Sequence, residues 1–347
     1  MGLWVSKRAR GTGCLSLVAW AALACLAAAN PAHAQEVQHY PAPDTYGSVI
    51  VEDGWPQQLD QDYNDVAFRY NMRIYRDASG KVSQVLISMH IQAHGGTMSK
   101  GLALQFPFPA STPHIAQIQR DQEDSMTIEP MTGEPKLTFV FYDEIREAFS
   151  DTAGGDIDPG EFINTDKNLP VRRAETIAFE VQFDPPLDFS LDPPFDLFVF
   201  RTAEYAHQIH LSNYGPTDVA LENPAIADLF GSEDDCSAQV CIAPDGSTVD
   251  NTGRWYVNNQ GLPWAIEVAA EIQWPVEGKS IELAYPQFLG WAASGGETNT
   301  DWYLFGDPEY LYDLFLLPGV PGLLPGPAWV LLGVMAALGA LRLRGRR

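Results

Sequence analysis

Residues 66–92 decide the fold: VAFRYNMRIY (66–75), RDASGK (76–81) and VSQVLISMHIQ (82–92). Apolar and polar side chains alternate through much of the first and last segments, which is the two-residue period of a half-buried β-strand. The middle segment is polar and places Gly80 late, where a tight turn needs a residue that tolerates a left-handed backbone. The stretch therefore predicts two antiparallel strands, 66–75 and 82–92, joined by a short turn.

The same strand-like pattern recurs on both sides of this hairpin. Further strands are predicted at 102–106, 137–142, 176–183, 196–200 and 266–272. The Pro-Pro pairs at 185–186 and 193–194 should lie outside any central strand, because proline cannot donate to a strand ladder. One helix is predicted, Ile281–Trp291, and Pro286 limits where it can begin. The expected fold is all-β, a β-sandwich or jelly roll with few short helices.

The two ends of the chain have the composition of targeting segments. Residues 1–34 run from Lys7, Arg8 and Arg10 through an apolar stretch to Ala32-His33-Ala34, which is the layout of a secretory signal peptide. Residues 318–347 are Pro-rich, then apolar, then carry four arginines. That order predicts a transmembrane helix with its tail in the cytoplasm. The expected organisation is a signal peptide (1–34), an exported ectodomain (35–317) and a C-terminal sorting or anchor segment (318–347).

The C-terminal segment resembles the sorting signals of the PEP-CTERM type, which combine a short Pro-rich motif, an apolar helix and an Arg cluster. Its motif is Leu-Pro-Gly-Pro-Ala-Trp (324–329) rather than Pro-Glu-Pro. The resemblance implies processing by an exosortase-like membrane protease of a Gram-negative bacterium. A permanent anchor is the alternative. In both cases the membrane is an expected partner, and the ectodomain lies outside the cytoplasm.

Charge and cysteine usage agree with export. The chain holds 45 Asp and Glu against 21 Lys and Arg, a formal net charge of −24. Nucleic acid is not an expected partner, because phosphate contacts need clustered cationic side chains. Once residues 1–34 are removed, Cys236 and Cys241 are the two cysteines that remain. An oxidising compartment then predicts a disulfide between them.

The sharpest group of oxygen-bearing side chains comes just before the first clear strand, in Asp60-Gln61-Asp62-Tyr63-Asn64-Asp65. Ca²⁺ prefers several carboxylate and carbonyl oxygens in a flexible shell, so we predict a calcium site formed by Asp60, Asp62, Asn64 and Asp65. The loop is not an EF-hand, because its sixth and twelfth positions lack the required Gly and Glu. The alternative is an Asx-rich turn whose side chains cap backbone amides.

The common enzymatic signatures do not occur in the sequence. It contains no H-E-x-x-H, G-x-S-x-G, Walker or dinucleotide motif, so we predict neither catalytic nor cofactor-binding residues. A non-enzymatic structural, adhesion or matrix-binding role is favoured, with a polysaccharide or a surface protein as the ligand. The alternative is a secreted glycan hydrolase that uses paired carboxylates. The many aromatic residues between 255 and 303 are expected mainly in the core.

Several separated motifs resemble the LruC-type domain of exported bacterial proteins. The opening motifs are 51–56 (VEDGWP), 62–66 (DYNDV) and 101–106 (GLALQF). Others follow in the family order, among them 214–218 (YGPTD), 262–265 (LPWA) and 301–303 (DWY). The likeness covers roughly residues 50–305. It implies a secreted or surface-exposed protein whose domain has no known activity, and it supports a cation at Asp62, Asn64 and Asp65 without supplying catalytic residues.

Overall fold

The computed structural model describes residues 36–121, 123–150, 157–158, 160–188, 195–232 and 234–313. The predicted signal peptide (1–34) and C-terminal segment (318–347) lie outside the described residues. Within the described part of the chain, no helix is long and apolar enough to cross a membrane.

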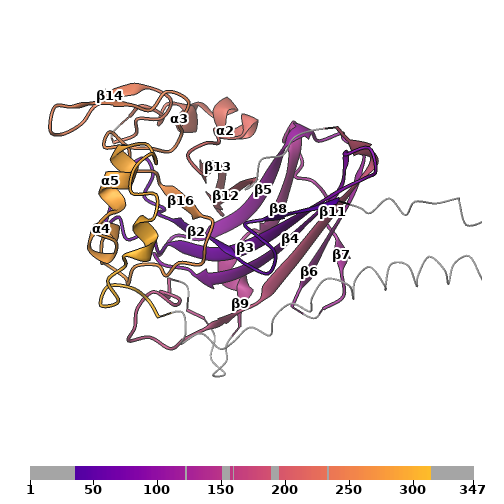
Figure 1. Cartoon of the computed structure of the whole chain (residues 1–347), viewed down its shortest axis with the longest axis horizontal. Helices are drawn as coiled ribbons and strands as arrows, with labels where there is room; N and C mark the ends of the chain where they lie inside the picture. The colour runs from indigo at the N-terminus through magenta and orange to yellow at the C-terminus, as the bar shows by residue number, and fades with distance from the viewer. Residues whose placement is uncertain are drawn as a thin grey trace, which may run out of the picture.

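Most of the ordered backbone lies in two antiparallel sheets (Figure 1). The larger sheet has the order β16 (Ala265–Val268), β2 (Gly47–Val51), β3 (Val66–Arg76), β4 (Val82–Ala93), β11 (Thr176–Leu187), β6 (His114–Arg120) and β7 (Met126–Thr127), with β1 (Glu36–Tyr40) also paired to β3. The smaller sheet has the order β13 (Glu204–Ile209), β12 (Asp196–Arg201), β5 (Lys100–Pro109) and β8 (Lys136–Tyr142). Two small sheets of two strands pair β9 (Phe149–Ser150) with β10 (Arg173–Ala174), and β14 (Val240–Ile242) with β15 (Thr248–Asp250).

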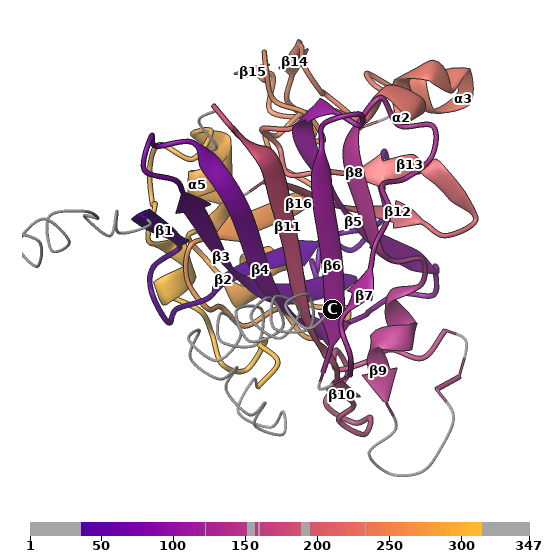
Figure 2. The ribbon, with the colours of Figure 1, turned by 90° about the vertical axis from the view of Figure 1, so that its right-hand side faces the viewer.

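The main hydrophobic core lies between the two sheets, which confirms a mostly β chain. Alternate residues of β3, such as Phe68 and Met72, and of β5, such as Leu104, point into this core. Phe139 of β8 and Phe179 of β11 meet across it with ring centroids 5.0 Å apart. Figure 2 shows β4, β11 and β6 of the larger sheet side by side, with strands of the smaller sheet beside them. The alternation that predicted the strands therefore reflects one face packed on this core.

The helices are few and short, as expected: η1 (Ile145–Ala148), α2 (Asp218–Glu222), α3 (Pro224–Ala227), α4 (Ile281–Ala284), α5 (Phe288–Ala293) and η2 (Trp302–Leu304). The single helix predicted over 281–291 is wrong. The chain forms α4 and α5 instead, separated at Tyr285-Pro286-Gln287. Pro286 explains the break, because proline lacks the amide hydrogen and disfavours helical backbone at the residue before it.

The last described residues build a second hydrophobic core on the other face of the larger sheet. We call residues 272–313 the C-terminal lobe. Its side chains, including Trp274, Phe288 and Trp302, pack against Ile50 of β2 and Ile266 of β16. Figure 1 shows α4 and α5, in yellow-orange, beside the ends of β2 and β16. The late aromatic residues therefore mostly fill a core, as the sequence predicted.

Most strand predictions hold, with two local differences. The hairpin of residues 66–92 is present as β3 and β4, paired in antiparallel register from Ala67 to Arg76. The strand predicted at 266–272 ends earlier, because β16 stops at Val268. The first Pro-Pro pair lies within the bounds of β11, contrary to expectation, but beyond Gln182, where the register with β4 shifts. The predicted disulfide between Cys236 and Cys241 is present.

Candidate metal centre

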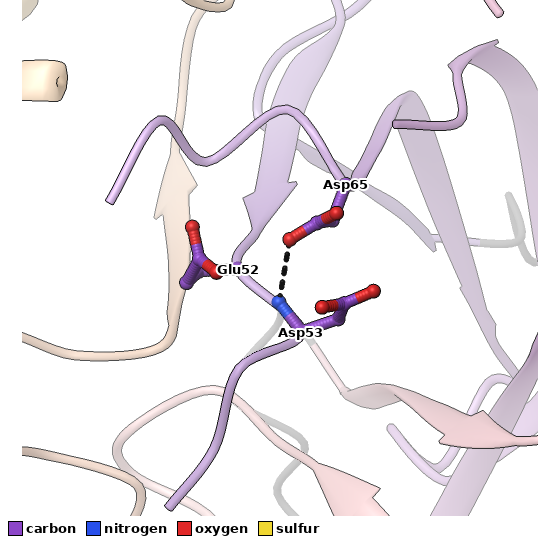
Figure 3. Close-up of side chains that lie close together, drawn as sticks. All are labelled: Glu52, Asp53 and Asp65. Atoms are coloured by element: carbon purple, nitrogen blue, oxygen red, sulfur yellow. Dashed lines mark hydrogen bonds between the residues drawn. The ribbon is translucent and has the colours of Figure 1, made fainter. Parts of the chain in front are cut away.

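The register of β2 and β3 brings acidic residues together at one end of the sheet. Val51 of β2 pairs with Val66 of β3, so the residue after β2 and the residue before β3 become neighbours. These residues are Glu52 and Asp65, and the next amide, that of Asp53, donates to the Asp65 carboxylate at 2.8 Å. Figure 3 shows the three side chains converging at this point.

Glu52 is buried without a partner for its charge. Glu52 is only 2% exposed, and neither of its carboxylate oxygens has a hydrogen-bond partner. Four other carboxylates surround it, those of Asp65, Asp62, Asp60 and Asp53. An unpaired carboxylate in such a place is costly, and buried charges in proteins are normally paired or coordinate a metal.

Lys100 compensates one side of this cluster. Its Nζ lies 2.6 Å from Asp53 Oδ2 and 3.6 Å from Asp65 Oδ1, and it also donates to the Gly95 carbonyl oxygen at 2.8 Å. The lysine is 1% exposed, so its ammonium acts as an internal counter-charge. Among the described residues, no ion pair links Lys100 or any other cationic side chain to Glu52, Asp60 or Asp62.

Two groups of three carboxylates have the spacing that a single cation requires, and Glu52 belongs to both. One oxygen from each of Glu52, Asp53 and Asp65 lies within 4.8 Å of the others, and the same holds for Glu52, Asp60 and Asp62. Calcium binds oxygens at about 2.3–2.6 Å, so two ligands on opposite sides of it are about 5 Å apart. Lys100 already faces the first group. The second group, Glu52–Asp60–Asp62, is the better candidate for a metal ion.

The four residues predicted from the sequence take different places around this centre. Asp62 and Asp65 are buried, and Asp60 is exposed. Asn64 is buried, and its side-chain nitrogen donates to the carbonyl oxygen of Pro275 at 3.3 Å. Its backbone amide donates to Asp62 Oδ1 at 3.4 Å. The sequence analysis missed Glu52 as a member of this cluster and Lys100 as the partner of Asp53 and Asp65. The only available signal for Glu52 was its presence in the VEDGWP motif.

Two glycines after β4, Gly95 and Gly96, bring the backbone close to the acidic centre. A side chain at Gly96, which has φ of +66°, would place its Cβ 2.5 Å from Asp65 Oδ1. A Cβ at Gly95 would lie 2.2 Å from Asn64 Oδ1. Only glycine allows the backbone to approach the carboxylates this closely.

Burial and mutual repulsion raise the pKa values of these acids. Burial, followed by the charge of Asp65, raises the pKa of Glu52 well above its usual range. Burial raises the pKa of Asp62 to about 8, with Asp60 adding to the effect and the Gly278 amide opposing it. Burial also raises the pKa of Asp65 to about 7, against the opposing charge of Lys100. Without a metal ion, the cluster therefore retains protons near neutral pH.

We expect the free energy of unfolding, measured in chelator, to fall as pH rises from about 6.5 to about 8. The unfolded carboxyls ionise near pH 4, whereas folded Asp62 holds its proton up to pH of about 8. The folded state thus binds more protons in this window, and that contribution to stability is lost with rising pH. Histidines do not offset it, because their unfolded pKa is about 6.5. Urea unfolding measures the trend, and Asp62→Asn should flatten it. A free energy of unfolding that rises between pH of about 6.5 and about 8 would contradict the prediction.

A separate groove of about 650 Å³ lies between the β14–β15 hairpin and the end of α5. Its lining includes Asp245, Asp250, Arg254 and Glu297. Hydrogen bonds from Ser247 lower the pKa of Asp245, and hydrogen bonds from Thr252 lower that of Asp250. A glycoside hydrolase needs a carboxylic acid with a raised pKa as its proton donor. These two aspartates are shifted in the opposite direction.

Comparison with known proteins assigns the family and leaves the activity open. Residues 80–303 match DUF4842, a domain of unknown function, and the chain belongs to this family. The matched range includes Gly95 and Lys100 but begins after Glu52, Asp62 and Asp65. No curated protein matches the chain.

The fold also resembles a solved crystal structure. That structure is a putative lipoprotein from Bacteroides ovatus, with a TM-score of 0.55 and 16% sequence identity, and the alignment covers 80% of this chain and 76% of that one. Similarity at this level of identity is evidence of a shared fold.

Proposed function

We propose that the protein is an exported, non-enzymatic β-protein of the cell envelope that binds Ca²⁺ between Glu52, Asp60 and Asp62. The observation that carries the proposal is the Glu52 carboxylate, which is buried, has no hydrogen-bond partner and lies among four other acids. A cation at this point supplies the missing counter-charge. Because it binds the folded state, it stabilises the fold by mass action.

The donor set favours calcium over other common metals. All the side chains of the centre offer oxygen, whereas zinc sites are built mainly from Cys and His. Magnesium requires a compact octahedron and usually keeps several waters, while calcium accepts irregular shells of six to eight oxygens. Affinities of about 10⁻⁴–10⁻³ M suffice for modules exposed to extracellular calcium.

Several observations support placement in the envelope. Residues 1–34 and 318–347 have the composition of an export signal and a membrane segment, and the Cys236–Cys241 disulfide suits an oxidising compartment. The similar fold is that of a protein described as a putative lipoprotein. The proposal includes the LruC-type resemblance, exosortase-like processing of the PEP-CTERM-like segment, and a polysaccharide or surface protein as ligand.

We expect calcium to raise the melting temperature of the wild-type protein relative to chelator, and Glu52→Gln to abolish this rise. Glutamine keeps the shape of the side chain but removes its charge, so the cation loses a central ligand. In chelator the variant should be at least as stable as the wild type, because glutamine has no carboxyl group whose ionisation burial opposes. Differential scanning calorimetry of both proteins with calcium and with EGTA provides the measurement.

Glu129→Gln is the matched control, because Glu129 is an exposed acid and the same charge is removed. This control should keep the full calcium response. An equal melting temperature of the wild type in calcium and in EGTA would refute the proposed site.

A further inference from the structure

Residues 60–65, which include Asp60 and Asp62, also connect the two packed sheets, here called the sandwich, to the C-terminal lobe. The amide of Gly278 donates to Asp62 Oδ2 at 2.8 Å, and the amide of Ile281, the first residue of α4, donates to the carbonyl oxygen of Gln61 at 2.9 Å. Asn64 adds the bond to the Pro275 carbonyl described above. Three successive points of the lobe are thus hydrogen-bonded to residues 61–64.

An aromatic contact and a buried hydroxyl fix the same loop. The ring of Tyr63 lies 5.7 Å from the ring of Phe288 in α5, measured between centroids. The Tyr63 hydroxyl donates to the carbonyl oxygen of Pro263 at 2.6 Å, just before β16. Residues 61–64 therefore form the contact between the larger sheet and the lobe, which we call the seam. Glu52, next to the end of β2, lies on the sheet side of this contact.

The lobe depends on this seam for much of its order. Its helices α4 and α5 have four and six residues, too short to be stable alone, because isolated helices of fewer than about 12 residues are marginal in water. Its order comes from packing on the larger sheet, at Ile50, Ala67 and Ile266, and from hydrogen bonds. Some of these bonds join it to residues 61–64, and others join it to residues 164–167. Asp60 and Asp62 lie in the loop that provides the bonds to residues 61–64. Their carboxylate oxygens lie within 4.8 Å of Glu52, and Asp62 accepts the bond from Gly278.

We propose that the cation bound by Glu52, Asp60 and Asp62 acts as a clasp that holds the C-terminal lobe against the sandwich. The inference rests on the proposed calcium site and adds its consequence for regulation. Occupancy fixes residues 60–64 to the end of β2, and the loop in turn fixes residues 275–281. Loss of the cation loosens the lobe locally, while the sandwich, held by its own core and by Lys100, stays folded. The exchangeable ion thus sets the exposure of the last described part of the chain.

Hydrogen exchange followed by mass spectrometry on the full chain tests the clasp. In EGTA, we expect amides of residues 275–293 to exchange at least about tenfold faster than in calcium, while β4 and β11 keep their protection. Asp62→Asn removes a proposed ligand, so exchange of its lobe should be the same in calcium and in EGTA. Asp301→Asn is the matched control, because Asp301 is an exposed acid of the same lobe. Its amides should exchange as those of the wild type do in both conditions.

The outcomes separate the clasp from the metal site itself. If calcium raises the melting temperature but lobe exchange is unchanged, or accelerates equally in all strands, the clasp is refuted and the calcium site stands. If calcium alters neither melting nor exchange, both fail. Selective deprotection of residues 275–293 in the wild type supports the clasp even if Asp62→Asn does not fold.

Discussion

Replacing Lys100 with methionine should destabilise the protein by about 3–5 kcal/mol, the cost of removing one partner from a buried ion pair. Methionine fills a similar volume, so the loss is mainly electrostatic. The Asp53 and Asp65 carboxylates lose their counter-charge, and the Gly95 carbonyl loses its donor. Urea unfolding of both proteins in chelator measures the difference.

Calcium should restore part of the stability of Lys100→Met. The group formed by Glu52, Asp53 and Asp65 has cation spacing and no longer faces an ammonium in this variant. The calcium-induced rise in melting temperature should therefore exceed that of the wild type. Lys81→Met is the control: Lys81 is exposed, so its loss should change stability by no more than about 0.5 kcal/mol. A similarly small effect of Lys100→Met would show that the buried ion pair is not stabilising.

Trp274→Ala should cost about 3–5 kcal/mol, as large-to-small substitutions of buried aromatic residues do. Trp274 is fully buried in the second core. Its indole Nε1 donates to the carbonyl oxygen of Asn164 at 2.8 Å, and its ring stacks on Tyr312 at 5.6 Å between centroids. Alanine leaves a cavity and leaves the Asn164 carbonyl oxygen without this donor. It also removes the packing that holds the first residues of the lobe in place.

Two further variants isolate the causes of the Trp274 effect. Trp274→Phe keeps most of the packing but removes the indole donor, so it should fall between the wild type and alanine. Phe305→Ala removes an aromatic ring that is 51% exposed in the same lobe, and its effect should be small. Chemical denaturation monitored by circular dichroism measures all three. Equal losses for Trp274→Ala and Phe305→Ala would show that the second core contributes little.

β3 and β4 could be predicted because their side chains partly alternate, with one face meeting the main core. β12 is buried on both faces over residues 196–200, and its run of apolar residues indicated a strand without alternation. β2 is also buried throughout: Val49 and Val51 face the main core, and Ile50 faces the second core. A strand covered on both faces has no two-residue period, and the short apolar run of β2 was missed.

The candidate metal centre could be predicted only in its local part. Asp60, Asp62, Asn64 and Asp65 lie within six consecutive residues, so a local turn can bring some of their oxygens together. Glu52 joins them only through the pairing of Val51 with Val66, and Lys100 only through the path of the chain from β4 into β5. Contacts of this kind depend on tertiary structure, and no local spacing encodes them.

Lys100 and the proposed calcium ion would balance the acidic centre in different ways. The Lys100 ammonium is part of the chain, so dilution or chelation cannot remove it. A calcium ion at Glu52, Asp60 and Asp62 would instead exchange with the medium. If the proposed site is correct, the concentration of calcium around the protein decides whether the second position is filled, while the first is always filled.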